Sequence, residues 1–175
     1  MLLIVLRQLG LIYLRSQGGG VQLEEGPPTG VPMIPFSELD DESKEEFRFP
    51  DGNSRLALLL FASPHCAICK EVLRGLRVVN RAPDVQVVVL SEGGLEANKE
   101  LRRFAKEASR FVTSLQRQRA LGVTTIPFGI AVDGKTGVVL RKAVVNNLHD
   151  VEQLLDDARV QLDTDVILMA GETST

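Results

Sequence analysis

Residues 55–73 read RLALLLFASPHCAICKEVL, and this stretch decides the fold. Leu56–Ala62 is an uninterrupted apolar run of strand length, which is typical of a strand buried on both faces. Ser63-Pro64-His65 then breaks the run. The residues that follow have an apolar stripe at helical spacing: Cys69, Val72, Leu73, Leu76 and Val79. The two cysteines of the chain therefore lie at a strand-to-helix turn, as Cys66-x-x-Cys69.

This position predicts a redox site. A thiol at a helix N-terminus faces unpaired backbone N–H groups and the positive end of the helix dipole, which favour its thiolate. Two thiols one helical turn apart can also form a disulfide with each other. Cys66 is nearest the loop, so we expect it to be the nucleophile, whereas Cys69 is shielded one turn inside and resolves the mixed disulfide. No cofactor is expected beyond the redox-active Cys66–Cys69 disulfide.

Pro64 and His65 precede the pair and are candidate modulators of its reactivity. A protonated His65 would stabilise a thiolate at Cys66. The alternative is that His65 is an exposed turn residue with no such role.

Three alternatives compete with the redox interpretation of the cysteine pair. A CxxC pair is half of a zinc site, but the chain has no second CxxC or HxxxH, so we expect no metal site. A copper-delivery module is an alternative that is not an enzyme. Such a module would need a histidine near the paired thiols, and His149 is the candidate; otherwise His149 is a surface residue. A peroxiredoxin-like peroxidase would use Pro-x-x-x-Thr/Ser-x-x-Cys, which Ser63 matches, but Leu59 stands where the proline is required.

The composition indicates one soluble globular domain. The chain has 175 residues, of which 44% are hydrophobic and 25% charged. A net charge of -3 argues against nucleic acid as a partner, and the absence of tryptophan with 5% aromatic residues argues against base stacking. Because both cysteines lie in one motif, no structural disulfide framework is expected.

The chain divides into four regions. Residues 1–15 are apolar but interrupted by Arg7, shorter than the roughly 20 residues of a spanning helix, and no basic residue precedes them as in a signal peptide. They are either an interfacial or core helix or the end of a membrane anchor whose beginning is missing. Residues 16–33 are a Gly/Pro-rich linker. The folded domain is expected at 34–160, and a flexible tail at 161–175, fraying from about Asp163.

The expected element order is β-α-β-α-(β-α)-β-β-α. Residues 34–36 and 47–49 are expected to form an edge hairpin around a solvated acidic turn at 37–46. Further strands are expected at 85–90, 110–113, 128–132 and 138–145, and helices at 95–110 and 116–121. A last helix is expected to be capped by Asn147, with Asp150 at its third position. Ile126-Pro127 precedes one of these strands, and a proline after a β-branched residue there is compatible with a cis bond.

These motifs resemble the thioredoxin superfamily, and within it the membrane-tethered TlpA-like and methylamine-dehydrogenase maturation (MauD-like) thiol–disulfide proteins. The resemblance covers about Val31 to Ala158, and MauD-like proteins carry the same Ser-Pro-x-Cys-x-x-Cys-Lys motif. The segments that carry it are Phe61–Lys70, Thr125-Ile126-Pro127, Asp133-Gly134 and Val144-Val145-Asn146. The chain departs from thioredoxin in lacking a buried acid in Leu56–Ala62.

The resemblance implies an α/β fold, a thioredoxin-like three-layer sandwich with a mixed central sheet flanked by helices. It implies a cis Pro127 beside the cysteines, with Thr125, Ile126 and Pro127 docking an extended substrate as an added strand. The implied function is a protein thiol–disulfide oxidoreductase that matures a partner enzyme, served by a second redox protein. Whether it works as oxidase, reductase or isomerase stays open. The implied location is periplasmic or extracytoplasmic with a membrane tether, or cytoplasmic if the N-terminus is complete as given.

Overall fold

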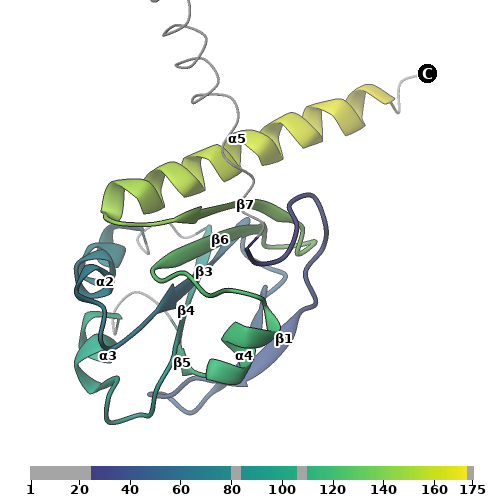
Figure 1. Cartoon of the computed structure of the whole chain (residues 1–175). Coiled ribbons are helices and arrows are strands. Elements are labelled where there is room, and N and C mark those ends of the chain that lie inside the picture. The colour runs from purple at the N-terminus through teal and green to yellow at the C-terminus, as the bar shows by residue number, and fades with distance from the viewer. Residues whose placement is uncertain (1–24, 80–83, 106–109, 173–175) are drawn as a thin grey trace, which may run out of the picture.

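A computed structural model describes residues 25–79, 84–105 and 110–172. The elements, labelled in Figure 1, are β1 (Phe36–Leu39), β2 (Glu46–Phe49), β3 (Leu56–Ala62), α2 (Ala67–Val79), β4 (Val85–Ser91), α3 (Lys99–Ala105), β5 (Arg110–Thr113), α4 (Leu115–Ala120), β6 (Phe128–Asp133), β7 (Val139–Val144) and α5 (Leu148–Glu172). The predicted N-terminal apolar segment lies outside the described residues. Within the described part, no helix is both long and apolar enough to span a bilayer.

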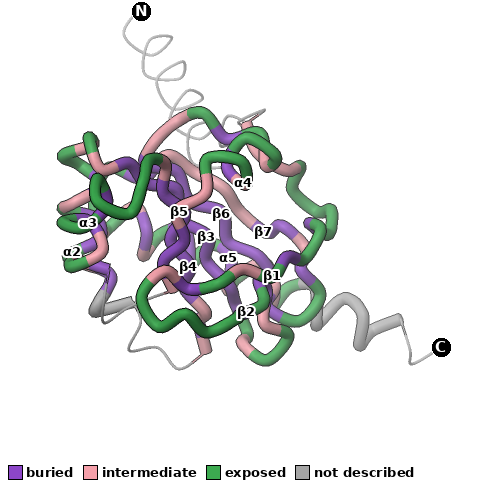
Figure 2. Tube along the Cα trace, turned by 90° about the horizontal axis from the view of Figure 1, so that it is seen from below, coloured by how far each residue is buried: buried purple, intermediate pink, exposed green. Residues whose placement is uncertain are grey.

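The centre is a five-stranded mixed sheet in the order β5-β4-β3-β6-β7. β3 pairs with β4 in parallel, as expected of two strands joined by the α2 crossover, and with β6 antiparallel. All seven residues of β3 are buried, as its apolar run predicts. The central strands form the buried part of the chain in Figure 2.

Alternate residues of β3 face two cores, one on each side of the sheet. Leu56, Leu58 and Leu60 pack with buried residues of α2, α3 and α5. Leu59 and Phe61 face the other way, toward buried residues of β1, β2 and β7 and Val123. The predicted three-layer α/β sandwich is confirmed, with the β1–β2 hairpin contributing to the second outer layer.

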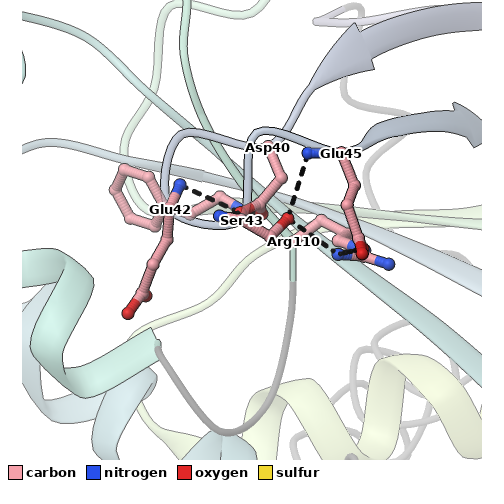
Figure 3. A network of polar contacts seen from close by, with 6 residues as sticks. Asp40, Glu42, Ser43, Glu45 and Arg110 are labelled. Carbon is pink, nitrogen blue, oxygen red and sulfur yellow. Dashed lines mark hydrogen bonds and ion pairs between the residues drawn. The ribbon is translucent and has the colours of Figure 1, made fainter.

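The predicted edge hairpin forms, but not at the edge of the main sheet. Phe36 pairs with Phe49 in a separate two-stranded sheet, and their ring centroids lie 5.4 Å apart. The prediction of a solvated turn over residues 37–46 is wrong at both ends, which belong to β1 and β2. It is also wrong at Asp40, which is 4% exposed. Its carboxylate accepts N–H groups of the turn and of β5, so the hairpin is fastened to the main sheet (Figure 3).

The helix predicted at 95–110 is shorter in the structure. α3 begins at Lys99, because the buried side chain of Asn98 holds the preceding residues in a turn. Asn98 Nδ2 donates to the carbonyl of Glu92 at 2.7 Å, and its Oδ1 accepts the hydroxyl of Ser91 at 2.6 Å. Arg110 begins β5 rather than ending a helix.

The last helix starts as predicted and continues further. The N–H of Asp150 donates to Oδ1 of Asn147 at 3.1 Å, and the N–H of Asn146 donates to Oδ2 of Asp150 at 2.7 Å. α5 runs to Glu172, into the region predicted as a flexible tail from about Asp163, and the helix contacts β6 and β7 (Figure 1). Leu162 still packs against the core, and Asp163 pairs with Arg55, so the helix is held beyond its first turns.

Candidate active site

Cys66 and Cys69 are joined by a disulfide, with their Cα atoms 5.3 Å apart. Cys66 precedes the first residue of α2, and its Sγ accepts the N–H of Cys69 at 3.1 Å, as an N-cap side chain does. Cys66 is half-buried, whereas Cys69 is 1% exposed and belongs to the core between α2 and the sheet. The two sulfur-bearing residues are therefore unequal in access, as the sequence predicts.

Ser63 shapes the turn that leads to Cys66. Its carbonyl accepts the N–H of Cys66 at 3.1 Å, and its hydroxyl accepts the N–H of His65 at 3.3 Å. Ser63 is buried, Pro64 is half-buried and His65 is exposed. The sequence analysis placed Ser63 in the break after the apolar run and in the Ser-Pro-x-Cys and peroxidase motifs, but missed its hydrogen-bonding role in the turn. A serine at a strand end before proline is a known turn signal that would have indicated it.

The Thr125-Ile126-Pro127 loop lies at the same edge of the sheet as the cysteines. Phe61, near the end of β3, pairs with Phe128, the first residue of β6. Because these strands are antiparallel, the turn after β3 and the loop before β6 are neighbours. Cys66 and Ile126 also pack against the same core cluster. The Ile126–Pro127 bond is cis, as the resemblance implies.

The backbone of Ile126 is unpaired within the described part of the chain. Among the residues that the structure describes, none hydrogen-bonds to its N–H or C=O, and its side chain is half-buried. The next carbonyl is already paired, because Pro127 C=O accepts the N–H of Val145 at 3.1 Å. A backbone edge is thus available at one residue of the loop, and the docking role of Ile126 and Pro127 stays a prediction.

The N–H of Thr125 is occupied, and the docking role of Thr125 also stays a prediction. The carboxylate of Glu25 accepts the N–H groups of Thr124 and Thr125 and, at 2.8 Å, the hydroxyl of Thr124. Burial raises the pKa of Glu25, but hydrogen bonds from Thr125 and then from Thr124 outweigh it and lower the pKa to about 2. The sequence analysis missed Glu25, and no local pattern links it to a loop so distant in the chain.

Two residues named for the competing functions, His149 and Leu59, belong to elements other than the cysteine turn. His149 is exposed in the first turn of α5, next to Leu148, whose side chain lies against Gly75 of α2. Within the described ranges, no group of three or more His, Cys, Asp or Glu side chains is arranged to hold a metal ion. Leu59, at the position of the peroxidase proline, is buried in the middle of β3.

A disulfide at the start of the helix that follows the central strand, with a cis-proline loop at the same sheet edge, defines a thioredoxin-fold protein with a CxxC site. The chain is 31% identical over 156 residues to the methylamine utilization protein MauD of Paracoccus versutus, covering 87% of this chain and 77% of that protein. It is 30% identical over 161 residues to MauD of Paracoccus denitrificans, covering 89% and 78%. The chain belongs to the MauD family. No family model matches it.

Solved structures support the fold independently. A putative thiol:disulfide interchange protein DsbE from Chlorobium tepidum aligns with a TM-score of 0.59 at 20% identity, over 77% of this chain and 97% of that one. A putative protein disulfide isomerase from Bacteroides thetaiotaomicron aligns with a TM-score of 0.63 at 12% identity, over 81% and 95%. Both alignments span most of the described domain, so the thioredoxin-like architecture is shared as a whole.

Proposed function

We propose that the protein is a thiol–disulfide oxidoreductase that exchanges disulfides with protein cysteines through Cys66 and Cys69. The observation that carries the proposal is their unequal access, half-buried for Cys66 and 1% exposed for Cys69. An incoming sulfur therefore meets Cys66 first.

In the oxidising direction, a substrate thiolate attacks Sγ of Cys66. A substrate–Cys66 disulfide forms, the Cys66–Cys69 bond breaks, and its electron pair stays on Cys69 Sγ, which takes a proton. A second substrate thiolate then attacks the substrate sulfur of the mixed disulfide, and Cys66 leaves as a thiolate. The N–H of Cys69, already 3.1 Å from Cys66 Sγ, is placed to donate to that thiolate.

In the reducing direction, the same steps run backwards. The Cys66 thiolate attacks a substrate disulfide, and the Cys69 thiolate attacks Cys66 Sγ and releases the reduced substrate. Two electrons move between substrate and CxxC pair in either direction. A second thiol–disulfide protein must then restore the pair, so a redox partner belongs to the proposal.

The unpaired backbone of Ile126 supports a mode of substrate binding. An extended peptide pairing with its N–H and C=O would add a short strand at this edge. Because the cysteine turn and the loop are neighbours, the substrate's sulfur would then lie beside Cys66.

The family supports a physiological setting. Since the relatives are methylamine utilization proteins, we place the substrate among the enzymes of methylamine utilization, with maturation of their disulfides as the task. The resemblance to membrane-tethered thiol–disulfide proteins favours an extracytoplasmic location and a tether formed by the apolar residues 1–15.

Trapping the mixed disulfide tests the proposal. Full-length Cys69→Ala, mixed with an oxidised disulfide-containing protein such as insulin, should accumulate an adduct through Cys66 that dithiothreitol releases. Cys66→Ala should accumulate none, because Cys69 is buried. Wild type, with both cysteines intact, serves as the control that should resolve any adduct. Adducts from Cys66→Ala alone would reverse the roles, and adducts from neither single-cysteine variant would refute the function.

A further inference from the structure

We propose that Glu25 is a positioning residue for the substrate: its carboxylate holds the Thr124–Thr125 loop so that the backbone of Ile126 is presented to a bound peptide. The inference rests on the proposed function and deepens it, because it names a residue that controls docking at the same site.

The contact is concentrated on one atom. Oε1 of Glu25 accepts the backbone N–H of Thr124, the backbone N–H of Thr125 and the hydroxyl of Thr124. Hydrogen bonds to an ionised carboxylate are about twice as strong as neutral ones. Two successive amide groups directed at one oxygen also fix the orientation of the peptide plane between them. The backbone is therefore held immediately before Ile126.

The segment that carries Glu25 is itself fastened to the sheet. Nζ of Lys142, on β7, donates to the carbonyls of Glu25 at 2.8 Å and Pro27 at 3.1 Å. The N–H of Gly26 donates to the carbonyl of Gly122 at 3.1 Å. Gly26 has a φ of 75°, and a Cβ there would lie 3.4 Å from Cδ1 of Ile130, so this backbone passes close over β6. Glu25 is consequently a fixed point from which the loop can be held.

Ile126 lies between two restraints. On one side Glu25 holds Thr125, and on the other Val145 donates to Pro127. Thr124 is exposed, so little packing is available there to replace a hydrogen bond lost at its N–H. Among the described residues, no hydrogen bond or ion pair joins Glu25 to Cys66 or Cys69. Removal of the carboxylate should therefore disturb docking and leave the chemistry of the cysteines unchanged.

Comparing a small thiol with a peptide separates an effect on substrate docking from an effect on the chemistry of the cysteines. Full-length oxidised wild type and Glu25→Ala would be mixed with dithiothreitol or with a ten-residue peptide carrying one reduced cysteine. Loss of the Cys66–Cys69 disulfide is followed by quenching, alkylation and mass spectrometry over a range of peptide concentrations. The reduction potential of each variant is measured against glutathione.

We expect Glu25→Ala to raise the half-saturating peptide concentration about tenfold, roughly the worth of one hydrogen bond to a charged group. The dithiothreitol rate, the maximal peptide rate and the reduction potential should not change. Glu25→Gln, which keeps an acceptor oxygen and the side-chain volume, should fall between Glu25→Ala and wild type. Glu45→Ala is the matched control: it removes the same side chain from an ion pair with Arg110, on the hairpin side of the sheet, and should behave as wild type.

Two results would overturn the inference, and a third would refute the proposed function on which it rests. Equal half-saturation for wild type and Glu25→Ala would show that the contact does not position the loop for docking. A parallel fall in the dithiothreitol and peptide rates would show a general distortion of the site, and Glu25→Gln extends this test if Glu25→Ala is poorly folded. A wild type that reacts with neither reagent would refute the proposed function itself, which is a different outcome from failure at Glu25.

Discussion

Asp40 fastens the β1–β2 hairpin to the main sheet, and its removal should destabilise the whole domain. Oδ1 accepts the N–H groups of Glu42 at 2.9 Å and Ser43 at 2.7 Å (Figure 3). Oδ2 accepts the N–H of Phe111, on β5, at 2.9 Å. The Phe111 N–H lies in a buried part of the structure, so Asp40→Ala would leave it without an acceptor. We expect this substitution to lower the free energy of unfolding by about 2–4 kcal/mol: about 1–3 for the unsatisfied donor and about 1 for the lost turn contacts.

Urea denaturation followed by circular dichroism measures this change. Glu46→Ala removes an exposed carboxylate from the adjacent strand and should alter stability by no more than about 0.5 kcal/mol. The slope of the transition should be the same in all variants, because the domain still unfolds as one unit. A cost for Asp40→Ala as small as that of Glu46→Ala would refute the reasoning.

The pH dependence of Asp40 gives a second test of the same contact. Burial raises its pKa, but hydrogen bonds from Ser43, Phe111 and Glu42 outweigh burial, and the pKa lies below its ordinary value of 3.8. A carboxyl with a lowered folded-state pKa stabilises the protein above its unfolded pKa and loses that contribution as pH falls through the folded one. The stability difference between wild type and Asp40→Asn should therefore be constant near neutral pH and shrink below about pH 3.8. A difference that stays constant to pH 2 would contradict this.

Three further predictions follow from other parts of the molecule. In the reduced protein, iodoacetamide should modify Cys66 at least about tenfold faster than the 1% exposed Cys69, measured by peptide mass spectrometry, and equal rates would remove the asymmetric assignment. Gly129→Ala would place a Cβ 2.7 Å from Cδ2 of Leu154 and should cost about 1–3 kcal/mol in thermal unfolding, whereas Gly94→Ala, with nothing within 4 Å, should be neutral. The amide resonances of Thr124 and Thr125 should titrate with Glu25 near pH 2 rather than 4.5, and this titration should vanish in Glu25→Gln.

The parts of the fold set by local patterns were predictable from the sequence. β3 follows from its seven apolar residues, α2 from its apolar stripe, and the start of α5 from the cap at Asn147. Each of these signals lies within a few residues of the element that it specifies. The unequal access of Cys66 and Cys69 follows from the same helical geometry, since one turn separates the helix end from its buried face.

The parts decided by distant contacts were not predictable. Asn98 shortens α3 because its amide is buried against Ser91 and Glu92, and an asparagine in a charged stretch carries no sign of that burial. In the sequence Asp40 is one acidic residue among several, and its contact with β5 exists only in the folded chain. Glu25 stands in the predicted linker and meets the loop only in the folded chain. In each case a polar side chain satisfies backbone groups of another segment, and only the tertiary fold brings the two segments together.

The antiparallel pairing of β3 with β6 explains how such distant segments form one site. The cysteines follow the end of β3, and the docking loop precedes the start of β6, so reversal of strand direction brings both to one edge of the sheet. The pairing of β6 with β7 then supplies the remaining parts, because Val145 follows β7 and Lys142 lies within it. In the described part of the chain, neither residue hydrogen-bonds to a sulfur atom. Val145 holds the backbone of Pro127, and Lys142 holds the segment whose Glu25 bonds to Thr125. The sheet therefore positions the reacting sulfurs directly, through α2. It positions the backbone of Ile126 indirectly, through Glu25 and the hydrogen bonds on either side of that residue.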